Sequence, residues 1–181
     1  DGRTYEWDMM GPASGWRIVH NHLHHTHTNI VGLDRDVGYG MMRISELQPW
    51  HPRFLLQPFM NLLLAAFFEW GISFHNVQTK PFFRGEKSFR TLASELLGLV
   101  HKMWRQLAKD YVLFPLLAGP NAFVVFAGNF AANTIRNVWA YAVIFCGHFP
   151  EGVASFTIED TRDESRGQYY LRQMLGSANL E

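Results

Sequence analysis

Residues 111–150 form the longest weakly charged stretch of the chain, with Arg136 as the one formal charge in forty residues. A bilayer core of ~30 Å needs about 20 helical residues per crossing at ~1.5 Å per residue. The stretch therefore predicts two transmembrane helices, which we expect to be joined by a tight turn near "GNFAAN" (128–133). A buried helical hairpin in a large soluble protein is the alternative, although soluble core helices are seldom uncharged over such a length.

A second apolar segment, 54–79, contains Glu69 as its only formal charge and is long enough to span a bilayer. The segments on both sides of it, 1–53 and 80–110, carry lysine and arginine, and the positive-inside bias assigns both to the cytoplasm. They can share a side only if 54–79 does not cross. We therefore expect an interfacial or re-entrant helix there.

These patterns predict an all-α fold, a helical integral membrane protein with a cytoplasmic histidine-rich region that binds metal. Within 80–110, apolar residues at helical spacing predict a helix over 89–109, with Leu92, Leu96, Leu99 and Val100 on one side. Sixteen acidic and sixteen basic residues balance, which gives no reason to expect a nucleic-acid partner. A single cysteine excludes an internal disulfide framework.

The chain opens on Asp1 and closes on "LGSANLE", and we expect both ends to be internal to a longer protein. It is then one domain, incomplete at both ends. Its segments are a cytoplasmic histidine-rich region (1–53), an interfacial or re-entrant helix (54–79), a basic cytoplasmic segment (80–110), two transmembrane helices (111–150) and a cytoplasmic segment (151–181).

The stretch "HNHLHHTHTN" (20–29) holds five of the nine histidines. On a helix over 18–27, His20 and His24 share a face, and His25 lies a further ~100° round. This arrangement suits two metal ions better than one. His22 points away from that face, and His27 falls where "THTN" is expected to unwind the helix. No H-E-x-x-H motif or cysteine pair is present, which argues against a zinc protease or a structural zinc site.

His148 ends the last apolar run, in "CGHFP", and is expected at the membrane surface with the histidine-rich region. It is a further candidate ligand, or else an interfacial histidine bonded to a backbone carbonyl. Ligating imidazoles need an acceptor for their second ring nitrogen. The polar candidates for that acceptor are Asn21, Asn29, Asp34 and Asp36, among which the sequence does not choose.

Four strings make the chain resemble the membrane fatty-acid desaturases, in particular the bacterial acyl-CoA desaturases of the Δ9, stearoyl-CoA type: "HNHLHHTHTNIVGLDRDVGYG", "WHPRFLLQPFMNLLLAAFFEWG", "RNVWAYAVIFCGHFP" and "DESRGQYYLRQMLGSAN". That family carries three histidine boxes around a di-iron centre. Residues 20–25 resemble the second box, which implies that His20, His24 and His25 are iron ligands. His148 resembles an additional ligand at the end of the fourth crossing. The other two boxes are expected outside this chain, so histidines from elsewhere would complete the two non-haem iron sites and the chain alone would be inactive.

The resemblance implies an oxidoreductase that uses O2 and two electrons to place a cis double bond in a saturated acyl-CoA or other acyl-lipid. No glycine-rich dinucleotide motif is present, so ferredoxin or a cytochrome, fed by a separate NAD(P)H reductase, would donate the electrons. No catalytic residue is expected beyond the metal ligands. Aromatic residues near His148 are candidates to line the acyl site, or to pack between helices or against lipid: Trp139, Tyr141, Phe145 and Phe149.

Arg166, Tyr170 and Arg172 lie on a polar stretch and are candidates to contact a lipid headgroup or an electron donor, or to form a solvated helix face. Two other functions share the histidine pattern. One is a membrane di-iron hydroxylase or ketolase of lipids or alkanes. The other is a non-enzymatic metal-binding membrane module. The strings "CGHFP" and "GQYYLRQMLGSAN" favour the desaturase.

Overall fold

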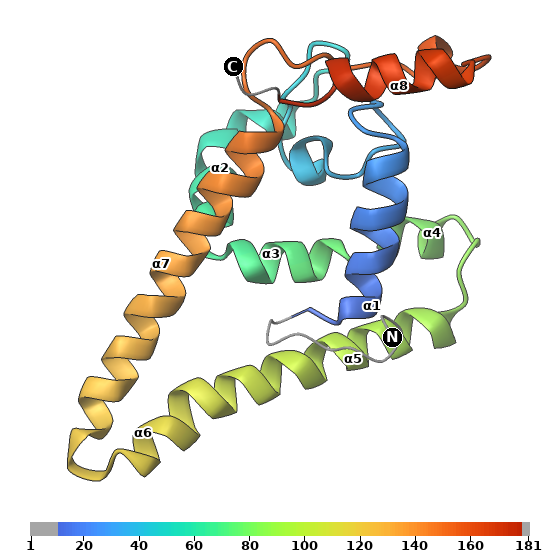
Figure 1. Ribbon diagram of the computed structural model, residues 1–181. Helices are drawn as coiled ribbons and strands as arrows, with labels where there is room; N and C mark the ends of the chain where they lie inside the picture. The colour runs from blue at the N-terminus through green and yellow to red at the C-terminus, as the bar shows by residue number, and fades with distance from the viewer. Residues whose placement is uncertain (1–10, 179–181) are drawn as a thin grey trace. The chain divides into compact units, whose positions relative to one another are not determined.

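The computed structural model describes residues 11–178, and over that range it is built from helices, which confirms the all-α prediction. Within the described range the extended pairings are isolated bridges, Ile30 with Phe156 and Val31 with Asp34. In the order of Figure 1, with η for 3-10 and π helices, the elements are α1 Ala13–Trp16, η1 Arg17–His24, η2 Val37–Gly40, η3 Pro52–Leu56, α2 Gln57–Ala66, α3 Phe68–His75, α4 Thr79–Phe83, α5 Phe89–Ala108, η4 Lys109–Leu113, α6 Phe114–Leu117, η5 Gly119–Asn121, α7 Ala122–His148, η6 Glu159–Thr161 and α8 Arg166–Leu175.

The chain folds as two compact units. In the described part of the chain, one unit comprises 11–16 and 66–139, and the other comprises 17–65 and 140–178. The first holds α3 to α6 and most of α7. The second holds the histidine-rich segment, α2, the end of α7 and α8. Each is described by itself below.

Helix α5 of the first unit confirms the helix predicted over 89–109. It begins after Ser88, whose side-chain oxygen accepts a hydrogen bond of 3.1 Å from the amide of Thr91, a cap that satisfies an otherwise free N–H. Leu92 and Leu99 are buried in a cluster with Val77. Leu96 and Val100 are exposed, because at ~100° per residue they rotate progressively away from the line that joins Leu92 and Leu99.

The turn in the apolar segment lies earlier than the sequence suggested. We expected it near 128–133, but α7 runs unbroken through those residues, and the chain reverses at Gly119–Asn121 (Figure 1). Asn129 and Asn133, which look like turn residues in the sequence, bond instead to Asp110 of η4, the helical segment that follows α5. The Asn129 side chain donates to the carbonyl oxygen of Asp110 (2.6 Å), and Asn133 donates to the Asp110 carboxylate (3.1 Å). The asparagines therefore join two helices rather than ending one.

The apolar segment 54–79 is broken at Phe67 into α2 and α3. Glu69, on α3, is buried and forms an ion pair with Arg136 of α7, and its backbone N–H donates to the Asn137 side chain (2.9 Å). Among the described residues no single helix is both long enough and apolar enough to cross a membrane. Pro52–Ala66 and Phe68–Phe83 reach that composition only together, as a bent pair.

In the second unit, the turn after the histidines is held to the C-terminal part of the chain. Val31 donates to the carbonyl of Phe156 (2.8 Å), and the amide of Phe156 donates to the carbonyl of Asn29 (3.0 Å). Asn29 has a φ of 56°, in the left-handed region that asparagine tolerates better than most residues. Its side chain donates to the carbonyls of Ala154 (3.1 Å) and Gly176 (2.8 Å). These bonds fix where the histidine helix stops.

Candidate metal centre

The histidine helix is wound more widely than an α-helix. Residues Arg17–His24 form a π-helix, and helical geometry continues to Thr26, so His27 lies just beyond the helix as the sequence indicated. A π-helix bonds residues five apart, which requires more than four residues per turn. Residues at i+4 and i+5 then both fall near the face of residue i. His24 and His25 stand in those positions relative to His20.

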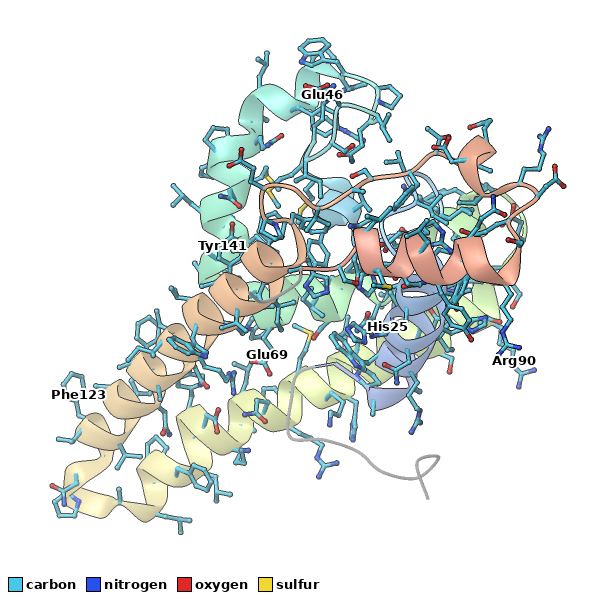
Figure 2. The ribbon with its side chains drawn as sticks, turned by 45° about the horizontal axis from the view of Figure 1, so that its top comes forward. His25, Glu46, Glu69, Arg90, Phe123 and Tyr141 are labelled. Atoms are coloured by element: carbon cyan, nitrogen blue, oxygen red, sulfur yellow. The ribbon has the colours of Figure 1, made fainter. Side chains whose placement is uncertain are left out.

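The winding brings three imidazoles together where the sequence suggested two together and one apart. Ring centroids are separated by 5.5 Å for His20 and His24, 4.6 Å for His20 and His25, and 5.2 Å for His24 and His25. An ordinary α-helix would place His25 ~140° from His20, so the wider winding brings its ring closer. His25 is nevertheless not part of the group formed by His20, His24 and His148, and its separate direction stays a prediction. Figure 2 labels His25 on this helix.

His148, from the end of α7, joins the same cluster. Its ring centroid lies 5.0 Å from that of His24, and one candidate ligand atom from each of His20, His24 and His148 lies within 4.8 Å of the other two. Residues 124 positions apart in the chain are therefore close enough to share a metal ion. His22, by contrast, is exposed and belongs to no such group among the described residues.

An oxygen atom accepts a hydrogen bond from Nδ1 in each of the three grouped histidines, His20, His24 and His148. His20 pairs with the side-chain oxygen of Asn21 (3.0 Å), His24 with the Asp34 carboxylate (3.0 Å), and His148 with the carbonyl of Ile144. An Nδ1–H that donates to oxygen fixes the neutral tautomer in which Nε2 carries the lone pair. The donor set is thus three oriented imidazoles, a chemistry that fits iron, zinc or copper.

Asp34, the acceptor for His24, is held in place by burial and by further hydrogen bonds. Its side chain is fully buried. Its two oxygens also accept hydrogen bonds from the backbone amides of Asn29 (2.8 Å) and Asp36 (2.9 Å). Asp36 lies 3.7 Å from His24 Nδ1, beyond hydrogen-bonding distance. Of the four polar candidates, the structure thus selects Asn21 for His20 and Asp34 for His24, while the Asn29 side chain bonds backbone carbonyls instead.

The pKa values of the neighbouring residues His24 and His25 are shifted in opposite directions. Burial acts to lower the pKa of His24, but the hydrogen bond to Asp34 and the charges of Asp34 and Asp36 outweigh it, and the pKa lies above 6.5. For His25, burial and the nearby imidazoles of His20, His24 and His148 lower the pKa below 6.5. The cluster therefore holds an anchored histidine beside one that resists protonation.

The C-terminal helix α8 does not offer Arg172 to an external partner. Arg172 is buried, and its guanidinium forms two bonds with the Glu164 carboxylate (2.8 and 3.1 Å). The headgroup or donor role considered for it is therefore wrong, because its donors point into the protein. Arg166 and Tyr170 are exposed and bond to each other (3.2 Å), so for these two residues that role stays a prediction.

A groove of about 670 Å³ lies in the same unit, within the size range of small-ligand sites. Its wall contains Phe145, which precedes His148 by about one helical turn, and Asn61 of α2. The hydroxyl of Tyr141, a residue labelled in Figure 2, donates to the Asn61 side chain, and its ring stacks on Phe145 with centroids 5.1 Å apart. Trp139 is 71% exposed, so its environment differs from that of the buried Phe145.

Sequence reasoning missed three polar residues beside the histidines: Thr28, Glu164 and Gln173. One signal was available. "SRGQ" (165–168) is a capping box, and the structure contains both of its bonds. The backbone N–H of Gln168 donates to the Ser165 hydroxyl (3.4 Å), and the backbone N–H of Ser165 donates to the Gln168 side-chain oxygen (2.8 Å). The box marks the start of α8, but it does not reveal what α8 contacts.

Comparison of the sequence with known proteins identifies its family. The family model described as Fatty acid desaturase matches residues 2–181. The chain is 45% identical, over 181 residues, to NADPH-dependent stearoyl-CoA 9-desaturases of two Mycobacterium tuberculosis strains, covering 98% of this chain and 42% of each relative. A shorter match, 49% identity over 49 residues, covers 26% of this chain and 13% of the sn-1 linoleoyl-lipid 6-desaturase of Synechocystis.

The chain thus spans less than half the length of the curated relatives that match nearly all of it. The comparison with solved structures found no match.

Proposed function

This chain belongs to the fatty acid desaturase family, and on that premise we propose that it forms part of a membrane acyl-CoA desaturase, which places a cis double bond in a saturated acyl chain. The observation that carries the proposal is the convergence of His20, His24 and His148, whose candidate ligand atoms lie within 4.8 Å of one another and whose Nδ1 atoms each lie beside an oxygen. The relatives are named for stearoyl-CoA and for NADPH, which supports an acyl-CoA substrate and electrons from NADPH.

His20, His24, His25 and His148 are the proposed ligands to two non-haem iron ions, with the remaining ligands supplied by parts of the protein beyond these 181 residues. Neutral imidazoles suit ferrous and ferric iron and leave the charge of the centre to be set by other ligands. Bound iron would supply the oxidising chemistry, with O2, that unactivated C–H bonds require and side chains cannot provide.

The chain's own residues would orient the ligating imidazoles and bind the acyl chain. Asp34 and Asn21 hold two imidazoles in their ligating direction, and the Ile144 carbonyl does the same for His148. The groove with Phe145 in its wall is the proposed acyl site, since burying an apolar chain lowers its free energy roughly in proportion to the apolar area removed from water. Ferredoxin or a cytochrome, with an NAD(P)H reductase, is the proposed route for electrons.

We further propose that the protein is integral to a membrane, with the histidines on the cytoplasmic side. The proposal rests on the apolar composition of these segments: two crossings would meet at the Gly119–Asn121 turn, the second of them in α7, and 54–79 would lie at the interface or re-enter. Protease protection and reactivity of single introduced cysteines on either side of the membrane would test it. Labelling of residues 20–27 from the outside would contradict the proposal.

The activity is tested by expressing the intact protein in a host that lacks a desaturase and measuring fatty acids and iron. We expect new monounsaturated acyl chains, lost in His20→Ala, His24→Ala and His148→Ala together with bound iron. His22→Ala is the matched control, because His22 is exposed, and it should keep both. An oxygenated lipid product would indicate a hydroxylase, and metal binding without any product would indicate a non-enzymatic module.

A further inference from the structure

The histidine helix ends against α8, and three of the carbonyls there are satisfied by two adjacent residues of α8. A helix leaves its last carbonyls without intrahelical partners, and its C-terminal end carries partial negative charge. Arg172 donates to the carbonyls of Thr26 and Thr28 (3.4 Å each). Gln173 donates to the carbonyl of His25 (3.0 Å). Figure 1 shows α8 lying across the end of this segment.

Further bonds make the contact rigid. Glu164 grips the Arg172 guanidinium through two bonds, which leaves its other N–H groups directed at the helix end. The Thr28 hydroxyl lies 2.9 Å from the Gln173 side-chain oxygen and 3.1 Å from the carbonyl of His24, and its single proton is donated to one of these acceptors at a time. The carbonyl oxygen of His25, a proposed ligand, is held by Gln173 from outside its own helix, and that of His24 lies within reach of Thr28.

We propose that Arg172 and Gln173 are positioning residues for the metal centre: together they cap the histidine helix and fix the direction of His24 and His25. This inference rests on the proposed function for the identity of the metal site, but not on the substrate. A π-helix is a rare winding that isolated peptides do not favour, so its register needs support from the rest of the fold. The bonds from α8 act where the π winding gives way to the last helical turn.

The planar, forked guanidinium of Arg172 is needed for this positioning role. Only a planar guanidinium can bind one carboxylate through two bonds and still reach two carbonyls, whereas lysine presents a single ammonium. Arg172→Lys therefore keeps the charge and loses the geometry. Arg166→Lys is the matched control, because Arg166 is on the same helix, is exposed, and donates to the hydroxyl of Tyr170 on that helix.

The test uses the intact protein, purified in detergent and freed of metal, with Co²⁺ as a visible-spectrum probe of imidazole ligation. We expect Arg172→Lys to weaken Co²⁺ binding at least tenfold and to change the ligand-field bands, in line with the usual 10–100-fold effect of outer residues on metal affinity. Gln173→Ala, a milder change, should move the same bands in the same direction. Arg166→Lys should match the unaltered protein in both readouts.

Two results would overturn different claims. If Arg172→Lys and Gln173→Ala lower the melting temperature while affinity and bands stay as in Arg166→Lys, the two residues serve stability alone and the positioning role is refuted. If the unaltered protein binds no Co²⁺, or binds it equally well after His24→Ala, the metal centre itself is refuted. Should Arg172→Lys fail to fold, Gln173→Ala still decides the matter.

Discussion

Glu69 and Arg136 form an ion pair, and each is the only formal charge of its apolar segment, 54–79 and 111–150 respectively. Figure 2 labels Glu69 on α3. The Glu69 side chain is 4% exposed and that of Arg136 is 38% exposed. A charge buried alone in apolar surroundings is costly, and a partner removes most of that cost. Two isolated charges in the sequence are thus one neutral unit in the fold.

Removing either member should destabilise the first unit. We expect Glu69→Gln and Arg136→Gln each to cost about 2–3 kcal/mol, below the ~3–5 kcal/mol of a fully buried pair because Arg136 keeps solvent contact. The double variant should recover part of the loss, since no charge is then left alone. Denaturation in detergent measures each effect, with exposed Arg90→Gln as control. Additive losses in the double variant would show that the two side chains do not interact.

Asp34 and Asp36 lie at different distances from His24 Nδ1, and their substitution should therefore lower metal affinity to different extents. Asp34→Asn removes the charged acceptor of the Nδ1 proton, and we expect iron or Co²⁺ affinity to fall about 10–100-fold. Asp36→Asn, at 3.7 Å from the same nitrogen, should change affinity much less. Metal titration of both variants makes the comparison. Equal losses would mean that total negative charge, rather than the hydrogen bond, supports the site.

The metal-free protein should lose stability as the pH rises through the pKa of His24. That pKa is raised above the 6.5 expected in an unfolded chain, so folding favours the protonated form. The contribution is complete below pH 6.5 and disappears above the folded pKa. Because the lowered pKa of His25 acts in the opposite direction, the His24 contribution is measured as the difference in melting temperature between the unaltered protein and Asp34→Asn, which should shrink as the pH rises past 6.5. Metal-loaded protein should behave oppositely, because protons compete with metal for imidazole. A difference between the two proteins that does not change with pH would contradict the role of Asp34.

Phe145 should influence which acyl chains are used. Phe145→Ala enlarges the groove that Phe145 lines, and Phe145→Trp fills it. The fatty-acid profile of the expressing host should therefore shift toward longer or bulkier chains in the first case and shorter ones in the second. Trp139→Ala serves as control, because Trp139 is largely exposed. Identical profiles for all variants would move the acyl site elsewhere.

Local pattern was enough to predict part of this molecule. The periodicity of 89–109 marked α5, and the H-x-x-x-H-H spacing identified His20 and His24 as neighbours. The turn near 128–133 was wrong because asparagine and glycine suit turns, and no local signal shows that Asn129 and Asn133 bond to Asp110. The winding that turns His25 toward His20 also has no local signature.

The role of Arg172 was hidden for a different reason. A buried arginine and a solvated one look alike in sequence, and the carbonyls it meets lie 144 and 146 residues away. The acceptor for His24 was narrowed to four residues but not chosen, because Asp34 and Asp36 differ in position by two residues and in distance to His24 by less than an ångström.

The wide winding of residues 17–24 separates this histidine segment from any free peptide with the same letters. A peptide of that length is too short to hold a helix in water, still less a rare one. Its imidazoles would sample many directions and take whatever metal is offered in whatever ratio. Metal preferences measured on such a peptide would therefore describe a flexible chelator, whereas the folded chain selects by a spacing that its other segments impose.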